Sequence, residues 1–456
     1  MFSFRAFWRV AAPLAVGSLV WSAAGCSSGD SGRSGASGST GSQQRSAAAQ
    51  LQAFDPPSRF DTTKPVPLTQ AGGIFFNKST KAVSHVQASL SGTTYLSIDA
   101  GQLVATDVAT GSPIWSTTLV GNHAEPSSAT TAVESGPDAP VVAGGVVYAA
   151  EVGFQEAQGS SLDSFAVHVV GADLSSGQAA WQASLPFAPD GNAKASASAA
   201  ALLSTGVTVT EQGVVVQVSR GHGAPDAAWM LDAKTGETLW QVDGVVGASA
   251  TGRYGVVLTD SRSQVSVLDL QTGQPTTGGP VERTANGVIY PDEILPYAID
   301  GWVTVTMDYQ VPSNLYEETP HVEKLNTADG TWVNADSLVI DYHGAIASPM
   351  SCAAEPGQTL LLCDIHAFSS SGTQVQDYAT GEVVWIADGT TRKALTGAVQ
   401  FHGYVYGLVG DEPIVIDLAT GDDVEVSPGA APVLVDEYGA VLVDEQGSIT
   451  WVPAAA

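Results

Sequence analysis

Asp232-Ala-Lys-Thr-Gly-Glu-Thr-Leu-Trp240 is one copy of a nine-residue phrase that recurs along the chain. Three more copies keep its Asp, Thr or Ser, Gly and Trp, at residues 107–115, 173–181 and 377–385. Shorter copies keep the turn and lose or shift the Trp, at residues 269–273, 326–330 and 417–421. Seven copies of one phrase predict a repeat architecture.

Each phrase has a mechanical interpretation as a strand, a tight turn and a second strand. The Asp side chain accepts a hydrogen bond from the main chain two residues on, and the Gly takes a left-handed conformation that other residues avoid. The Trp that follows is large enough to fill the gap between neighbouring sheets. A further pair of β-rich runs precedes nearly every phrase, for example at residues 141–149 and 400–408. Four strands per unit are typical of a propeller blade.

The two ends of the repeat region complement each other. The C-terminal segments 432–435, 439–443 and 448–452 make three strands without a fourth, and residues 59–68 are the obvious donor of the missing strand. Residues 81–456 give eight units of about 47 residues, close to the length of known blades. We therefore predict an all-β fold, an eight-bladed β-propeller of four-stranded antiparallel blades closed by an N-terminal strand. Seven blades are the alternative.

The repeat resembles the PQQ-like, quinoprotein-type repeat over residues 81–456, and WD-repeat signatures are absent. The quinoprotein dehydrogenases of this family imply two adjacent cysteines beside the cofactor, Ca²⁺ ligands and often a Cys-x-x-Cys-His haem motif. This chain has neither cysteine motif, and its eight histidines never fall at a metal-ligand spacing. The sequence therefore predicts no enzyme, no cofactor and no metal. The overall layout is similar to that of the eight-bladed lipoprotein of the outer-membrane barrel-assembly machinery.

The first fifty residues predict export and a lipid anchor. A short cationic start and an apolar run make residues 1–25 a signal peptide. Ala23-Ala-Gly-Cys26 resembles a lipobox, which implies that Cys26 is lipidated, and the Ser- and Gly-rich residues 26–50 make a flexible tether. Residues 51–456 are then the propeller, at the extracytoplasmic face of the cell membrane. An ordinary secreted protein is the alternative.

The net charge of the chain limits the classes of partner that it can bind. The chain carries a formal net charge of −29, which makes nucleic acid an improbable partner. Anionic lipid would also repel this protein, so we expect membrane attachment through the lipid anchor only.

Besides Cys26, the chain has only Cys352 and Cys363. A hairpin with a type II′ turn at Gly357-Gln358 pairs these two positions across the strands, so the register predicts a disulfide. A zinc site is the rival interpretation, and two cysteines without a histidine cluster support it poorly.

The long segments of the chain all join blades or separate the middle strands of a blade. They are residues 120–140, 151–164, 186–205, 219–228 and 308–321. In a propeller these connections open on one face, so we expect the partner to bind there. The predicted partner-binding residues are Phe154, Glu156, Tyr309, Tyr316, Glu317 and Glu318. The predicted function is a protein-binding or scaffolding module with a protein or cell-envelope glycan as partner. A sensor of a small molecule or cell-wall ligand is the alternative.

Overall fold

In the computed structural model of the chain, the recurring phrase forms a tight turn between two antiparallel strands. At Asp232, the side-chain Oδ1 accepts hydrogen bonds from the main-chain N–H groups of Lys234 (2.9 Å) and Thr235 (2.8 Å). Gly236 has a left-handed φ of +71°, and its N–H donates to the Asp232 carbonyl at 2.8 Å. The hydrogen bonds from Thr235 and Lys234 hold the pKa of Asp232 below its usual value. The Asp and the Gly thus have the roles that the sequence predicts.

The described residues lie in one unit, Ala48–Ala456. They contain 36 strands and no helix, and therefore no helix that could cross a membrane. The structure describes residues 51–455 except 69–72, 78–81, 120–138, 156–163, 188–202, 220–225, 252, 260–264, 277–287, 300–301, 311–318, 327, 330, 336–339, 343–344, 348–351, 356–357, 368–369, 390–391 and 426.

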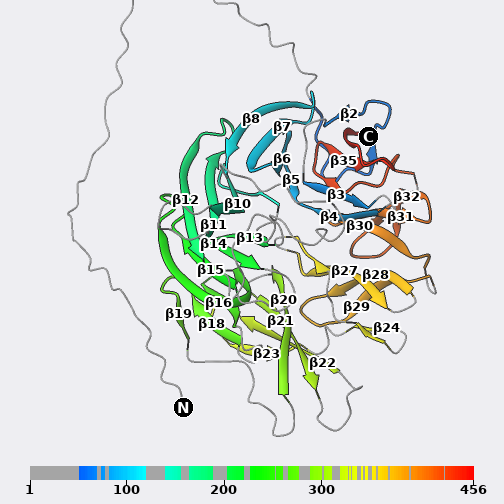
Figure 1. Cartoon of the computed structure of the whole chain (residues 1–456). Helices are drawn as coiled ribbons and strands as arrows, with labels where there is room; N and C mark the ends of the chain where they lie inside the picture. The colour runs from blue at the N-terminus through cyan, green and yellow to red at the C-terminus, as the bar shows by residue number, and fades with distance from the viewer. Residues whose placement is uncertain are drawn as a thin grey trace, which may run out of the picture. The chain divides into compact units, whose positions relative to one another are not determined.

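The first four blades follow one another in chain order (Figure 1). Blade 1 consists of β5 (Ala88–Ser91), β6 (Thr94–Asp99), β7 (Gln102–Asp107) and β8 (Ser112–Thr118). Blade 2 consists of β9 (Val141–Ala143), β10 (Val146–Gln155), β11 (Ser164–Asp173) and β12 (Ala179–Phe187). Blades 3 and 4 are built from β13 (Ser204–Thr210), β14 (Gly213–Ser219), β15 (Asp226–Leu231), β16 (Thr238–Thr251), β17 (Tyr254–Thr259), β18 (Val265–Asp269) and β19 (Gln274–Pro275).

The next three blades have the same antiparallel order. Blade 5 consists of β20 (Val288–Ile299), β21 (Trp302–Gln310), β22 (Thr319–Asn326) and β23 (Trp332–Asn334). Blade 6 consists of β26 (Cys352–Ala353), β27 (Leu360–Ala367), β28 (Ser370–Asp377) and β29 (Val383–Ala387). Blade 7 consists of β30 (Leu395–Phe401), β31 (Tyr404–Val409), β32 (Glu412–Asp417) and β33 (Asp423–Glu425). Two hairpins stand outside the blades, β3 (Ile74–Asn77) with β4 (Ala82–Val86), and β24 (Ile340–Tyr342) with β25 (Ala345–Ala347).

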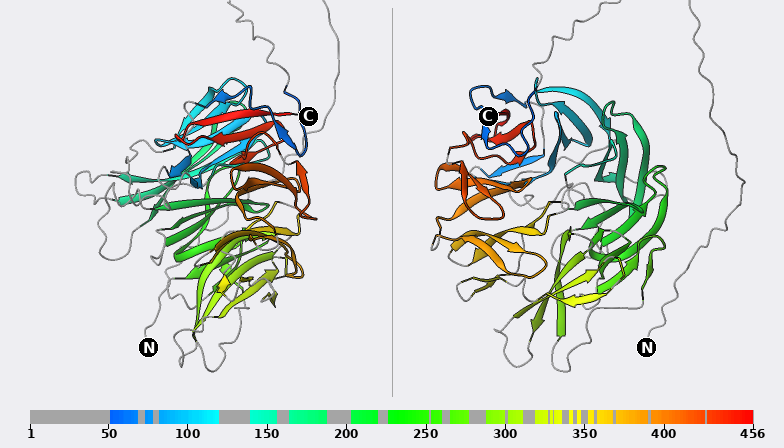
Figure 2. Two further views of the ribbon diagram at one scale, coloured as in Figure 1. Left: turned by 90° about the vertical axis from the view of Figure 1, so that its right-hand side faces the viewer. Right: turned by 180° about the vertical axis from the view of Figure 1, so that it is seen from behind.

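Blade 8 joins the two ends of the described chain. Its strands β34 (Leu434–Val435), β35 (Gly439–Val443) and β36 (Ile449–Ala455) come from the C-terminus, and β1 (Arg59–Phe60) supplies the fourth. The register pairs Arg59 with Ala455, and β2 (Val66–Pro67) also pairs with β36. The blue and red strands therefore lie side by side in the views of Figure 2. This confirms the eight-bladed fold and the N-terminal closing strand.

Blades 3 and 4 differ from the expected separate sheets, because they share one strand. The first half of β16 pairs with β15 as the outer strand of blade 3, and its second half pairs with β17 as the inner strand of blade 4. The two blades form one seven-stranded sheet, with a register shift between Val245 and Gly247. Gly244 and Gly247 flank the shift and small residues follow it up to Ala250, so the backbone can bend there without breaking its ladder.

Neighbouring blades are joined by an indole hydrogen bond. Trp181 of blade 2 donates through Nε1 to the carbonyl of Ala233 in the turn of blade 3, at 2.9 Å. The acceptor is the residue directly after the turn Asp. The same bond links three other junctions, Trp115 to Leu174 (2.9 Å), Trp240 to Leu270 (2.7 Å) and Trp385 to Leu418 (2.8 Å). The Trp fills the gap between neighbouring blades, as predicted. In addition, its indole binds the turn of the next blade.

A buried lysine takes this role between blades 5 and 6. Lys324 is 8% exposed, and its Nζ donates to the carbonyl of Tyr378 at 2.7 Å. Tyr378 is again the residue directly after the turn Asp, here Asp377. The ammonium group also lies 4.7 Å from the ring centre of Tyr378 and 5.7 Å from that of Trp302. Burial lowers the pKa of Lys324, and the charge of Asp377 opposes this shift.

Replacing Gly236 with Ala should destabilise the propeller by more than its backbone conformation explains. A Cβ at this position would lie 2.5 Å from Cε3 of Trp181, so the indole would have to move. Gly144 is the matched control, because its φ is also left-handed, at +58°, and a Cβ there meets nothing within 4 Å. We expect both variants to lose about 1–2 kcal/mol of unfolding free energy through strain and Gly236→Ala to lose a further ~1–3 kcal/mol through overpacking. Urea unfolding measures both, and equal losses would contradict the docking role of the Trp.

Lys324→Met should remove a pH dependence of stability. The pKa of Lys324 is lower in the folded protein than its ordinary value of 10.5. Between these two values the unfolded chain binds more protons, so the unfolding free energy of the wild type rises as pH increases toward 10.5. The Met variant lacks this gain. The unfolding free energy of the wild type should therefore increase relative to that of the Met variant as pH rises over this range. Unfolding curves measured at a series of pH values test this, and parallel pH profiles would contradict it.

Candidate functional site

The connections between strands sort onto two faces of the propeller. Because the strands of a blade are antiparallel, the first-to-second and third-to-fourth turns lie at one edge, which we call the turn face. Its connections are short, such as residues 92–93 and 108–111 in blade 1. The second-to-third connections and the exits between blades lie at the other edge, the long-connection face. They include residues 119–140, 156–163, 188–203, 220–225, 276–287 and 311–318.

Phe154 and Tyr309, the two predicted partner-binding residues that the structure describes, lie at the long-connection edge of two different blades. Phe154 is the next-to-last residue of β10 in blade 2, and Tyr309 is the next-to-last residue of β21 in blade 5. Blades 3 and 4 separate these two blades in the ring, so the structure does not bring the two residues together. The other four, Glu156, Tyr316, Glu317 and Glu318, lie outside the described residues.

The expected loops begin later than predicted. Residues 151–155 continue β10 and pair with β11, so Phe154 lies in a strand opposite Phe165. Tyr309 likewise lies in a strand, opposite Thr319. The reason is that polar residues such as Glu151 and Asp308 lie within segments whose backbone stays paired with the neighbouring strand. The placement of both residues in loops was therefore wrong, and their placement at the long-connection edge was right.

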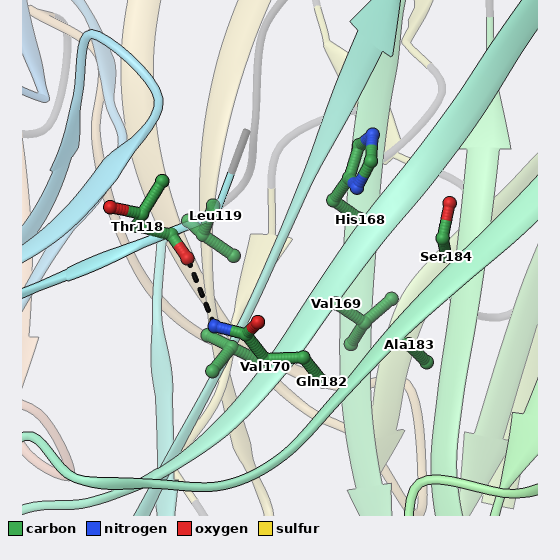
Figure 3. Close-up of a pocket in the computed structure, with 8 residues that line it drawn as sticks. All are labelled: Thr118, Leu119, His168, Val169, Val170, Gln182, Ala183 and Ser184. Carbon is green, nitrogen blue, oxygen red and sulfur yellow. Dashed lines mark hydrogen bonds between the residues drawn. The ribbon is translucent and has the colours of Figure 1, made fainter. Parts of the chain in front are cut away.

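A pocket of about 160 Å³ lies between blades 1 and 2. The end of β8 supplies Thr118 and Leu119, and β11 and β12 supply the opposite wall, including His168, Gln182 and Ser184 (Figure 3). The Gln182 side-chain amide donates to the Thr118 carbonyl at 3.1 Å and so spans the junction of the two blades. Sequence reasoning missed this pocket, because it forms only when two blades meet.

Three polar residues form a row across blade 2 beside the pocket. The register pairs Glu151 of β10 with His168 of β11, and His168 with Ser184 of β12. Glu151 is buried at 5% exposure, His168 is half-buried and Ser184 is exposed. Burial lowers the pKa of His168, and the charge of Glu151 opposes this shift. No cluster of three or more His, Cys, Asp or Glu able to hold a metal ion occurs among the described residues.

The two predicted disulfide cysteines are joined. Cys352 pairs with Cys363 in register across β26 and β27, both are fully buried, and a disulfide links them. The turn differs from the expected type II′ turn, because the Gln358 N–H donates to the Glu355 carbonyl at 3.0 Å. A turn centred on Gly357-Gln358 would instead join residues 356 and 359. Cys26 lies outside the described residues.

Together, the turn, the docked Trp and the eight four-stranded blades define a β-propeller of the PQQ-like repeat type. Residues 152–277 match the family model described as outer membrane protein assembly factor BamB. This span covers most of blades 2, 3 and 4. None of the curated proteins matches the chain.

Several solved structures match the chain at low similarity. A europium-containing methanol dehydrogenase has 11% identity and a TM-score of 0.41, over 80% of this chain and 81% of that one. A quinohemoprotein alcohol dehydrogenase from Pseudomonas putida HK5 has 12% identity and a TM-score of 0.35, over 81% and 66%. A eukaryotic initiation factor has 13% identity and a TM-score of 0.37, over 83% and 95%. Likeness at this level bears on neither activity nor ligand.

Alkylation should detect neither Cys352 nor Cys363 in denatured, unreduced protein and both of them after reduction. Mass spectrometry of the peptides measures this directly. A Cys352→Ala, Cys363→Ala double variant should lose at most about 3 kcal/mol of unfolding free energy, because the bond closes a short loop. Two alkylated thiols before reduction would contradict the assignment.

Proposed function

We propose that this chain is a lipid-anchored, extracytoplasmic β-propeller that binds a protein partner through its long-connection face. The observation that carries the proposal is the sorting of connections by length. The turn face of blade 1 has connections of two and four residues, at 92–93 and 108–111, whereas the opposite edge of the propeller carries segments such as residues 119–140 and 188–203. Binding residues concentrate on long connections held by a rigid frame.

The family match supports a protein partner in particular. The matching family is described as an outer membrane protein assembly factor, and an assembly factor works by contacting other proteins. The matched span contains the second-to-third connections of blades 2 and 3, at residues 156–163 and 220–225. By this analogy we place binding on these connections, and we place the anchor at Cys26, ahead of the tether.

The chain's own residues argue against the quinoprotein dehydrogenase alternative. Among the described residues the cysteines are Cys352 and Cys363, which face each other across two strands and are not adjacent in sequence. They form a cross-strand brace in blade 6, at the register position that the hairpin dictates. We therefore propose binding, and not quinone-dependent oxidation, as the role of the propeller.

The charge of the protein suggests the kind of surface that the partner presents. At a formal net charge of −29, long-range attraction favours a cationic partner and weakens as salt increases. We therefore expect a protein with a positively charged or neutral polar surface.

A photo-crosslinking residue placed at Tyr309 should capture the partner in intact cells, and the same residue at Lys234 should not. Tyr309 lies at the long-connection edge, and Lys234 is exposed in a turn of the opposite face. Mass spectrometry then identifies the adduct. Once it is identified, the Tyr309→Ala, Tyr316→Ala double variant should bind it at least about tenfold more weakly, because interface tyrosines are often worth more than 1 kcal/mol each.

The opposite crosslinking pattern would move the binding site to the turn face and overturn the proposal. An adduct with a cell-envelope glycan and no protein would replace the protein partner with a carbohydrate. Lys234→Ala serves as the binding control and should bind as the wild type does.

A further inference from the structure

The polar row of blade 2 faces blade 1 and begins where the apolar packing between these blades ends. Alternate residues of each strand face one neighbour. Val147 and Ala149 of β10, and Val170 and Ala172 of β11, pack in the cluster shared with blade 1. Glu151 and His168 have the same parity as these residues, so they face blade 1 as well. On β12, Trp181 and Leu185 pack in the cluster shared with blade 3, which places Gln182 and Ser184 on the blade 1 side.

The three residues are ordered by depth. Ser184 lies on the outermost strand and is exposed, His168 is half-buried on the next strand, and Glu151 is buried on the third. Residues directly opposite in neighbouring strands have Cβ atoms about 4.5–5.5 Å apart. A rotation of the exposed Ser184 side chain therefore brings its hydroxyl toward the imidazole. A hydrogen bond from Thr205 Oγ1 to the Ala150 carbonyl, at 2.8 Å, holds the backbone next to Glu151.

This order is the one that nucleophilic catalysis needs. A serine hydroxyl becomes a nucleophile when a neighbouring base takes its proton, and a third group holds that base in position. Burial favours the neutral imidazole, which is the form that accepts a proton. The buried carboxylate can stabilise the imidazolium that forms during the reaction.

We infer that Ser184, His168 and Glu151 form a hydrolytic site for short-chain carboxylic esters in the pocket between blades 1 and 2. Ser184 Oγ attacks the ester carbonyl carbon as its proton passes to His168. The bond to the leaving alcohol then breaks, and that alcohol takes the proton from His168. Water attacks the resulting acyl-serine in the same way, which releases the carboxylic acid and restores the serine.

Two features of the pocket set the substrate class and the roles of its residues. A volume of about 160 Å³ beside the apolar Leu119 fits a short acyl group. Gln182 lies two residues from Ser184 on the same face and uses one amide N–H on Thr118, so its second N–H is a donor for the developing oxyanion. Glu151 acts through His168 and is a positioning residue.

The test is labelling of the full-length protein with a fluorophosphonate probe, followed by peptide mapping. We expect the label on Ser184, none at this position in Ser184→Ala, and labelling slowed by about 100-fold in His168→Gln, because general-base catalysis contributes at least that factor. Ser116→Ala is the matched control, since Ser116 is also exposed on an outer strand and faces Val104 in register. It should label as the wild type does. Hydrolysis of p-nitrophenyl acetate should fall in parallel with labelling.

Thermal unfolding of each variant separates a lost site from a lost fold. Ser184 is exposed, so Ser184→Ala should unfold at the wild-type temperature. Absence of label at Ser184 in the wild type, or equal labelling of wild type and a folded His168→Gln variant, would overturn the inference. The crosslinking result at Tyr309 is independent of these outcomes.

Discussion

The structure depends on one interaction, the hydrogen bond from a Trp indole to the main chain of the next blade's turn. The acceptor carbonyl follows the turn Asp, and the indole ring covers the turn Gly, so one phrase ties together residues of two blades. This explains why the phrase recurs as a whole. Where the Trp is lost or shifted, other groups occupy its place. Lys324 does so between blades 5 and 6, and β2 does so between blades 8 and 1, where its Pro67 lies against Gly111.

The same dependence explains what could be predicted from the sequence. The phrase marks the end of the third strand in seven blades, so the repeat, the strand count and the closing segment followed from local chemistry. The pairing of Cys352 with Cys363 also followed, because the strand register is symmetric about positions 357 and 358 as predicted, although the hydrogen bond of the turn is not. The shared strand β16 did not follow, since no local signal separates a strand that ends from one that bends and continues. Phe154 and Tyr309 were placed in loops for a similar reason, because polar residues at the end of a strand resemble the start of a loop.

The row Glu151, His168 and Ser184 shows a different limit. Its members stand 17 and 16 residues apart, at no spacing that any motif recognises. They meet because strands β10, β11 and β12 align in a particular register, and a one-residue slip would turn one of them toward blade 3. The sequence shows which residues of one strand share a face, because they alternate. It does not show which residues of neighbouring strands stand opposite each other. A propeller can thus hold two kinds of site, one on its long connections and one in the seams between blades.

The closing strand also dictates an order of events in time. Arg59 pairs with Ala455, so the first described strand must wait for a residue 396 positions later in the chain before it can form its hydrogen bonds. Until then Tyr95 and Val108 of blade 1 lack the cover that Val441 and Trp451 of blade 8 provide. Contacts this distant in sequence form slowly, and the uncovered apolar face is prone to aggregate. A chain that leaves its ribosome or a translocation channel N-terminus first therefore exposes this face of blade 1 until the strands of blade 8 have followed it out.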